Sequence, residues 1–244
     1  MHYLALASDY DGTLAQDGVV APETIAAVRR LKQSGRRFLL VTGRELPELQ
    51  MVFPEFGLCD LIVAENGALL FTPATGELQP LGMPASDALV TALRRKGVTP
   101  LSVGTVIVAT REPYENVVLD SIRELGLELQ IIFNKGAVMV LPTGINKATG
   151  LEAALALLGF GADRVIGCGD AENDHAFLAM SGCGVAVANA LPMLKQTADV
   201  VTRRARGAGV VEIIEQVLDG GEAALRLAAA QRRRAENSLA LGPA

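Results

Sequence analysis

The chain has 244 residues with a formal net charge of -5, and 50% of its residues are hydrophobic. This length and composition predict one large domain or two small ones with a sizeable core. The acidic balance argues against nucleic acid as a partner, and no apolar run reaches the roughly 18 residues that span a membrane. Three cysteines without a CxxC pair, and no secretory signal pattern, favour a reducing cytoplasm.

The first third of the chain alternates between two kinds of segment. Short apolar runs predict strands at 4–8, 37–41 and 61–64, and amphipathic runs predict helices at 22–34 and 46–53. Strand–helix repeats with buried strands predict a parallel sheet that is covered on both faces.

The pattern changes between residues 80 and 142. Two units, each a helix followed by two strands, are predicted there: 85–95, 101–103 and 105–110, then 113–125, 128–133 and 137–141. Such units make an antiparallel sheet with helices on one face. We therefore expect residues 80–142 to form an inserted α+β domain of the order αββαββ.

The alternating pattern then resumes. Helices are predicted at 147–158, 172–179, 191–198 and 209–218, and strands at 164–168, 184–187 and 200–201. Residues 1–79 and 143–218 thus predict one α/β core domain, which the insertion interrupts. Residues 219–244 predict a helix-prone tail or linker, either a solvated helix or a partner-binding segment.

The most informative motif follows the first predicted strand. Asp9 and Asp11 stand two residues apart, so side-chain alternation points both carboxylates the same way, and their repulsion calls for a cation or a proton. A polar turn is the plain structural alternative. A calcium loop of the EF-hand kind is excluded, because Thr13 and Val20 stand where that loop needs acidic ligands.

Polar residues follow four of the predicted strands, and a lysine begins a helix. In an open α/β sheet such strand ends lie at one edge, where ligands bind. Each residue also has an ordinary structural role open to it, as a helix cap or a surface group. The set comprises Asp9, Asp11 and Thr13; Thr42, Gly43 and Arg44; Glu65 and Asn66; Lys147; and Asp170, Asn173 and Asp174.

Several acids around one hard cation, with a lysine and a threonine nearby, suit the chemistry of a phosphoryl group. A Mg²⁺ ion would neutralise charge, and lysine and backbone N–H groups would stabilise the transferring phosphoryl. An aspartate can itself attack phosphorus and form an aspartyl-phosphate. The chain has no Walker A loop and no Gly-rich fingerprint after the first strand.

These residues resemble the motifs of the haloacid dehalogenase superfamily, in its Cof-type phosphatase branch. The matching segments occur in the family's order across about residues 1–218: Asp9-Tyr-Asp11-Gly-Thr13, Thr42-Gly-Arg44, Lys147 and Gly169-Asp170-Ala-Glu-Asn173-Asp174. The resemblance implies a Rossmann-like parallel-sheet core. It also implies that the insertion is a small type-2 cap, similar to that of archaeal-type phosphoglycolate phosphatases.

The resemblance also implies roles for single residues. Asp9 would be the nucleophile and a metal ligand, and Asp11 the general acid/base whose carbonyl also binds Mg²⁺. Asp170 would be the metal ligand from the last motif. Phosphoryl or substrate contacts would come from Thr42, Gly43, Arg44, Lys147 and Asn173, with Asp174 and Asn66 in support.

The function implied is Mg²⁺-dependent hydrolysis of a small phosphorylated metabolite, such as a sugar phosphate or phosphoglycolate, through an aspartyl-phosphate. A phosphomutase, or a catalytically weak regulatory domain of a larger protein, remains open as an alternative. Candidate cap contacts lie at 103–105 and 134–136. Within them, Lys135 is either a surface lysine of a hairpin turn, which is the favoured expectation, or a contact to a substrate carboxylate or a second phosphate. The substrate and the oligomeric state stay open.

Overall fold

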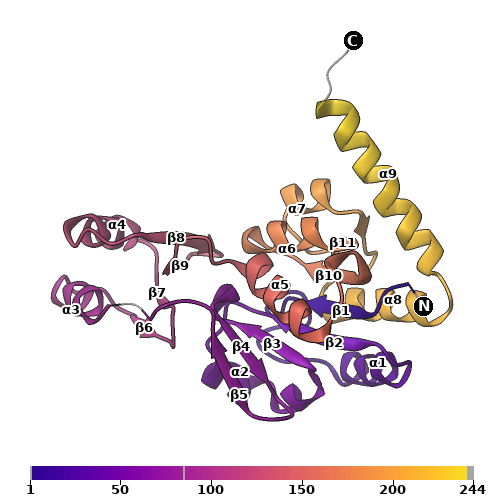
Figure 1. Cartoon of the computed structure of the whole chain (residues 1–244), viewed down its shortest axis with the longest axis horizontal. Coiled ribbons are helices and arrows are strands. Elements are labelled where there is room, and N and C mark those ends of the chain that lie inside the picture. The colour runs from indigo at the N-terminus through magenta and orange to yellow at the C-terminus, as the bar shows by residue number, and fades with distance from the viewer. Residues whose placement is uncertain (1, 85, 241–244) are drawn as a thin grey trace.

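The structure, a computed structural model, describes residues 2–84 and 86–240, with side chains as far as residue 234. Two sheets organise the chain (Figure 1). The larger has eight strands in the order β12-β11-β10-β1-β2-β3-β4-β5, and the smaller has four in the order β6-β7-β9-β8. This is the α/β arrangement with an inserted antiparallel sheet that the sequence predicts.

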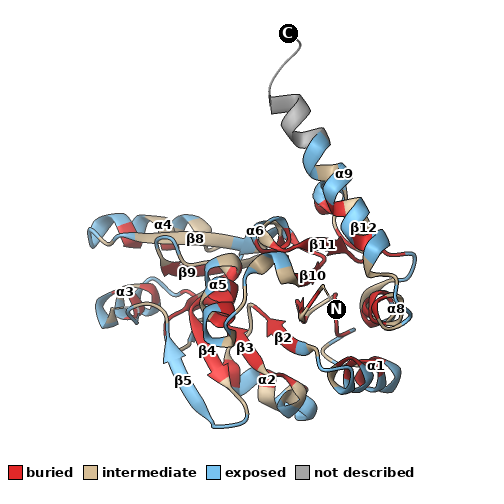
Figure 2. Ribbon diagram, turned by 45° about the vertical axis from the view of Figure 1, so that its right-hand side comes forward, coloured by how far each residue is buried: buried red, intermediate tan, exposed pale blue. Residues whose placement is uncertain are grey.

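The larger sheet is parallel from β12 to β3, and an antiparallel hairpin extends it. Its strands are β1 (Ala5–Ser8), β2 (Arg37–Val41), β3 (Leu61–Ala64), β4 (Leu69–Thr72), β5 (Glu77–Pro80), β10 (Val165–Gly169), β11 (Cys183–Ala186) and β12 (Val200–Val201). The central strands are buried along their length, which is why they are continuous apolar runs, whereas β5 is an exposed edge (Figure 2).

Helices cover both faces of this sheet, because alternate strand residues point to opposite sides. Leu6 and Phe38 pack with α1 (Pro22–Gln33), α2 (Leu46–Val52) and α8 (Arg206–Leu218). Ala7 and Leu39 pack on the other face with α5 (Lys147–Leu158), α6 (His175–Met180) and α7 (Pro192–Thr197). Short 3₁₀ turns connect some of these elements, at Pro54–Leu58, Glu65–Gly67, Ala162–Arg164 and Glu172–Asp174.

The smaller sheet has its own core. Its strands are β6 (Ser102–Val103), β7 (Val108–Arg111), β8 (Leu129–Asn134) and β9 (Ala137–Pro142), and its helices are α3 (Asp87–Arg95) and α4 (Glu115–Glu124). Leu89 and Leu93 of α3 and Val118 of α4 pack on one face of the sheet. The other face contributes Met139 to a cluster with Ala68 of the core, so this face lies toward the larger sheet.

Three details differ from the sequence prediction. The β4–β5 hairpin was not predicted as part of the larger sheet. The strand predicted at 105–110 is wrong over 105–107, because these N–H groups bind the Glu65 carboxylate rather than a neighbouring strand. The helix predicted at 172–179 begins as a 3₁₀ turn. The start of the helix predicted at residue 85 lies outside the described residues.

The C-terminal helix α9 (Glu222–Ala240) begins against the core and then extends away from it (Figure 1). The Glu222 carboxylate accepts hydrogen bonds from the His2 N–H and the Arg36 guanidinium, each at 2.7 Å. Leu225 and Ala229 are buried. In the described part of the chain, no helix is both apolar and long enough to span a bilayer.

The start of α5 lies unusually close to the loop that follows β3. An Asn146 capping box begins α5, with the Asn146 side chain accepting from Ala148 and Thr149 N–H groups. Gly67, at φ +105°, lies against this turn: a Cβ there would be 2.0 Å from the Asn146 carbonyl oxygen. The approach of α5 to the sheet therefore depends on the missing side chain at Gly67.

We predict that Gly67→Ala lowers the free energy of unfolding by about 3 kcal/mol, because the methyl group adds a backbone collision to an unfavourable φ. Gly76→Ala is the matched control, since Gly76 has φ +74° but no heavy atom within 4 Å of the added Cβ. It should cost only about 1 kcal/mol. Urea denaturation of both variants measures the difference, and equal losses would contradict the steric argument.

Candidate active site

The predicted site residues meet at one edge of the larger sheet. Strands β11, β10, β1, β2 and β3 are parallel neighbours, so their carboxyl ends lie side by side. Asp9, Thr42 and Asp170 directly follow β1, β2 and β10. Lys147 joins them from the first turn of α5. This edge is where ligands bind in open α/β sheets.

Lys147 is the buried centre of the site. Its side chain is 1% exposed, and its ammonium lies 2.6 Å from Asp9 Oδ1 and 2.6 Å from Asp174 Oδ1. The other Asp174 oxygen accepts the N–H groups of Asp170 and Ala171, at 2.8 and 2.9 Å. Both Asp174 oxygens are thus engaged, so Asp174 holds Lys147 and the loop after β10 in place.

Asp170 lies in a second polar cluster, which the smaller sheet completes. Its carboxylate accepts hydrogen bonds from Thr13, at 3.3 Å, and from Lys135, at 2.9 and 3.0 Å. The Lys135 ammonium also donates to the carbonyl oxygen of Asp11, at 2.7 Å. Lys135 sits at the tip of the β8–β9 hairpin with φ +48°. Lys135 is exposed, as expected for a lysine in a hairpin turn, and it also contacts the predicted site residues Asp170 and Asp11.

The two motif aspartates have different surroundings. Asp9 is buried beside Lys147, whereas the Asp11 side chain is 40% exposed and forms a bidentate ion pair with Arg44, at 2.6 and 2.8 Å. Arg44 also binds Glu48 at 2.6 Å. Both residues line the cavity described below, but Arg44 holds the Asp11 carboxylate and Lys147 holds that of Asp9. Only the Asp11 carbonyl faces Asp170, through Lys135.

The remaining predicted residues form a polar wall beside Lys147. The buried Thr42 hydroxyl accepts the Arg44 N–H at 3.1 Å, and Gly43 lines the cavity described below. Asn173 donates to Asn66 at 2.7 Å. Within the described residues, Asn66 Nδ2 and Asn173 Oδ1 are buried without a hydrogen-bond partner. Such atoms are costly unless a ligand or water satisfies them.

The oxygen atoms of this site fit a hard divalent cation. Carboxylate oxygens of Asp9, Asp170 and Asp174 lie within 4.8 Å of one another. Lys147 and two backbone N–H groups hold the Asp174 oxygens, whereas Lys135 of the smaller sheet holds the Asp170 oxygens and the Asp11 carbonyl. Mg²⁺ prefers such oxygen ligands. Three carboxylates also face only two ammonium groups, Lys147 and Lys135, which leaves one negative charge unmatched.

Burial perturbs both partners of the central ion pair. Burial, with smaller contributions from Asp174 and Asp170, raises the pKa of Asp9 from 3.8 to about 7, against the opposing effect of Lys147. Burial lowers the pKa of Lys147, but the charges of Asp174 and Asp9 together raise it by more, so the pKa lies above its ordinary value. The two directions are consistent, because burial penalises the charge of Asp9, while two nearby carboxylates stabilise the charge of Lys147.

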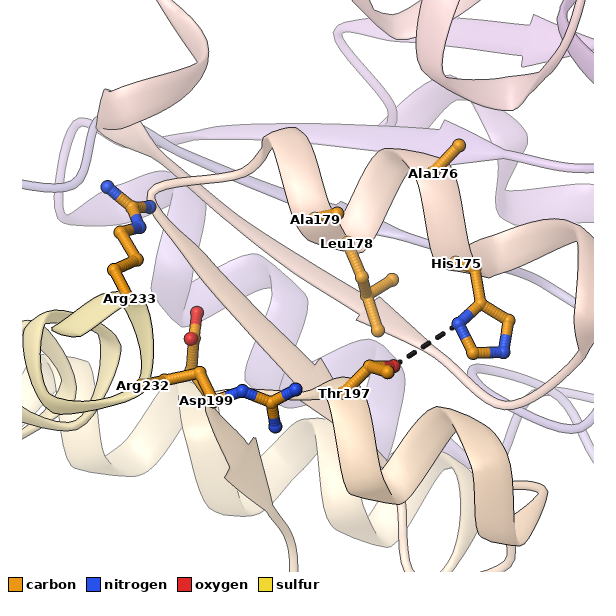
Figure 3. A pocket seen from close by; sticks show the side chains of 8 residues that line it. All are labelled: His175, Ala176, Leu178, Ala179, Thr197, Asp199, Arg232 and Arg233. Atoms are coloured by element: carbon orange, nitrogen blue, oxygen red, sulfur yellow. Dashed lines mark hydrogen bonds between the residues drawn. The ribbon is translucent and has the colours of Figure 1, made fainter. Parts of the chain in front are cut away.

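A cavity of 320 Å³ separates the two sheets at this edge. Asp9, Asp11 and Arg44 line it from the core, and Ile107 and Arg111 line it from the smaller sheet. A further cavity, of 430 Å³, lies elsewhere, between α6, the end of α7 and α9 (Figure 3). It is lined by His175 and Arg233 among others and contains none of the predicted site residues.

Sequence reasoning did not find Asn189. Its amide donates to the carbonyl of Gly12 at 2.8 Å and to Asp170 at 3.3 Å, and its side-chain oxygen accepts the Arg206 N–H at 2.7 Å. Asn189 comes shortly after β11, so the strand-end argument applied to this fifth strand would have identified it. The Lys135 contact has no comparable local signal.

We predict that Asp9→Asn stabilises the protein at high pH in EDTA. The pKa of Asp9 is higher in the folded protein than in the unfolded chain, so the protonated acid favours the folded state. This contribution to the free energy of unfolding is fully present below about pH 4 and is lost as the pH rises through about 7. At pH 8 the free energy of unfolding of the variant should exceed that of the natural protein by on the order of 3 kcal/mol. Near pH 4 the two should match. Urea denaturation at both pH values measures this, and a pH-independent difference would refute the burial argument.

The chain matches known proteins over most of its length. The family model described as haloacid dehalogenase-like hydrolase matches residues 6–80 and 102–214. Phosphoglycolate phosphatase 2 of Saccharolobus solfataricus is 33% identical over 229 residues, which cover 89% of this chain and 93% of that protein. A phosphoglycolate phosphatase of Methanothermobacter thermautotrophicus is 30% identical, with 88% and 98% covered.

A solved structure has the same fold. It is a HAD/COF-like hydrolase from Plasmodium vivax, with a TM-score of 0.75 and 20% identity over 89% of this chain and 96% of that one. The family match and the two relatives agree with the motifs at the strand ends and with the buried acid cluster. This chain belongs to the haloacid dehalogenase-like hydrolases and is a phosphatase.

Proposed function

We propose that this phosphatase uses Mg²⁺ to hydrolyse the phosphate monoester of a small anionic metabolite, through an aspartyl-phosphate on Asp9. One observation supports it above the others: Asp9 lines the cavity while Lys147 holds its Oδ1 at 2.6 Å. A carboxylate held in this way can present its other oxygen to phosphorus.

The residues would share the reaction as follows. Asp9 and Asp170, with the Asp11 carbonyl, would hold the cation, which neutralises phosphoryl charge when bound. Lys147, the Thr42 hydroxyl and backbone N–H groups near Gly43 would stabilise the phosphoryl oxygens. The unpartnered Asn66 and Asn173 amide atoms are further candidates for this contact or for an ordered water.

Asp11 would move the protons. As Asp9 bonds to phosphorus, the bond to the leaving oxygen breaks, and that oxygen takes a proton from Asp11. Asp11 then takes a proton from the water that attacks the aspartyl-phosphate, which releases phosphate and restores Asp9. Since Arg44 occupies both Asp11 oxygens, at 2.6 and 2.8 Å, the Asp11 carboxylate must leave Arg44 to reach the leaving oxygen.

Residues 80–142 would act as the cap. The cavity between the two sheets is small, at 320 Å³, which suits a small substrate. Closure of the cap over it would exclude bulk water from the reaction. Arg111 of the smaller sheet lines this cavity, and the Lys135 ammonium binds the carbonyl of Asp11, another lining residue. We infer that the substrate carries a second anionic group besides its phosphate, as phosphoglycolate does, which agrees with the names of the relatives. The phosphate ester of an uncharged sugar is the less favoured candidate.

Three buried cysteines support a reducing compartment. Cys59, Cys168 and Cys183 are all free thiols. Burial raises the pKa of each above its ordinary value, so they are inert core residues rather than reactive nucleophiles. We infer that the enzyme works in the cytoplasm.

We predict that Asp9→Asn lowers phosphate release from 2-phosphoglycolate and from p-nitrophenyl phosphate by about 10³-fold or more, because the nucleophile is lost. Asp11→Asn should also cripple turnover, while calorimetry shows Mg²⁺ still binding through the unchanged carbonyl. Release should require Mg²⁺ in the natural protein.

Asp60→Asn is the matched control for this experiment, since Asp60 accepts the Phe38 N–H at 2.9 Å at the opposite end of β3. Its activity should stay near that of the natural protein. Undiminished turnover by Asp9→Asn would exclude an aspartyl-phosphate on Asp9. Isomerisation of a sugar phosphate without phosphate release would instead indicate a mutase.

We also predict that Lys135→Met reduces kcat/KM for 2-phosphoglycolate about tenfold more than for ethyl phosphate, because a charge-assisted contact to the carboxylate is lost. Lys96→Met is the control, since Lys96 pairs with Glu124 at 2.7 Å within the smaller domain. Steady-state kinetics with both substrates measures the ratio. Equal losses for the two substrates would show that Lys135 does not read the carboxylate.

A further inference from the structure

Glu65 is a core residue whose carboxylate is held by the backbone of the smaller sheet. It directly follows β3 and is 1% exposed. Its Oε1 accepts the Thr105 N–H at 2.8 Å, and its Oε2 accepts the N–H groups of Val106 and Ile107, at 2.8 and 3.0 Å. These three residues form the tip between β6 and β7.

Through this contact, the burial of the Glu65 carboxylate and the burial of the tip's N–H groups depend on each other. A buried carboxylate is stable only where hydrogen-bond donors satisfy it, and here three successive N–H groups of the tip do so. The tip in turn has no strand partner for these N–H groups, because Glu65 takes all three. Separation of the tip from the core would leave both the carboxylate and the amides without these bonds.

The fit around the contact is tight. A Cβ added at Gly104 would lie 2.8 Å from Glu65 Oε1, so the tip backbone rests directly on the carboxylate. Val106 and Ile107 are buried in one apolar cluster with Ala68 of the core and Met139 of β9. The polar contact is therefore enclosed by apolar packing, which keeps water from competing for it.

The backbone of the same segment binds the loop that follows β2. The Glu65 N–H donates to the Arg44 carbonyl, and the Asn66 N–H donates to the Thr42 carbonyl, each at 2.9 Å. Glu65 and Asn66 have φ values of +51° and +56°, an uncommon conformation for residues other than glycine. Glu65 thus joins the proposed phosphoryl-binding loop to a wall of the cavity, which Ile107 lines.

The second tip of the smaller sheet contacts the core differently. Lys135, between β8 and β9, donates to Asp170 and to the Asp11 carbonyl, which are proposed metal ligands. A cation on these oxygens must displace the Lys135 ammonium, because like charges repel. The Glu65 contact uses none of those oxygens. When the site is loaded, the Lys135 tip therefore exchanges its contacts with these oxygens for contact with the substrate, whereas the Glu65 tip keeps its contacts.

We propose that Glu65 is a positioning residue that fixes the β6–β7 tip as the pivot on which residues 80–142 turn over the active site. Opening then occurs on the Lys135 side, while Ile107 keeps its place in the cavity wall. The proposal rests on the proposed function in one respect, that the cavity between the sheets receives the substrate.

Hydrogen exchange of the full chain, followed by mass spectrometry, tests the pivot without any turnover. Peptides covering 105–107 should stay equally protected in EDTA and in Mg²⁺ with inorganic phosphate, whereas peptides covering 134–136 should change their protection. Loss of protection at 105–107 on loading the site would overturn the proposal. Neither result depends on phosphate release, so failure of the proposed function would be recognised separately, as absent turnover by the natural protein.

Variants test the role of the carboxylate. Glu65→Ala should raise exchange at 105–107 about tenfold and raise KM for the substrate about tenfold, with kcat changed less than threefold. Glu65→Gln keeps one acceptor oxygen and should restore part of both effects. Asp60→Asn, which weakens a carboxylate contact to the Phe38 N–H at the far end of β3, should change neither.

Unchanged protection at 105–107 in Glu65→Ala would overturn the pivot, as would an equal rise in exchange over the whole chain. If Glu65→Ala does not fold, Glu65→Gln and the natural protein with and without Mg²⁺ and phosphate still decide the question. A rise in exchange confined to 105–107, together with the shift in KM, supports it.

Discussion

The buried ammonium of Lys147 is the interaction on which the rest of the site depends. It is 1% exposed and lies 2.6 Å from both Asp9 and Asp174, so it joins the end of β1, the start of α5 and the loop after β10. Removing the ammonium would leave two buried carboxylates uncompensated, which costs about 3–5 kcal/mol. The Lys147 ammonium therefore both positions the proposed nucleophile and stabilises the fold at this edge of the sheet.

The excess of negative charge around Lys147 favours the binding of a cation at this site. Asp9, Asp170 and Asp174 outnumber the two ammonium groups that face them, and the pKa of Asp9 is raised as a result of its burial among them. A site of this kind gains stability from a hard cation and from any group that shares the charge. Lys135, which comes from the smaller sheet, supplies part of that charge, so the electrostatics of the core depend on where the smaller sheet lies.

Sequence reasoning located the core of the site, because strand ends in a parallel sheet meet at one edge and polar residues there stand out from buried apolar runs. Asp9, Thr42, Lys147 and Asp170 were found in this way. What it missed depends on contacts between distant segments. Residues 105–107 have the composition of a strand, yet Glu65, some forty residues earlier, takes their N–H groups. The division of Asp9 and Asp11 between Lys147 and Arg44 is likewise decided by tertiary neighbours.

The order of strands in the larger sheet has a consequence for folding. β1 lies between β2 and β10, and the partner of Ser8 on β10 is Cys168. The smaller sheet pairs strands that all lie between residues 102 and 142, so its contacts can form while the core still lacks a central strand. Asp9 and Lys147 are 138 residues apart. The acidic cluster can therefore be complete only once the segment that carries Lys147, Asp170 and Asp174 has joined β1.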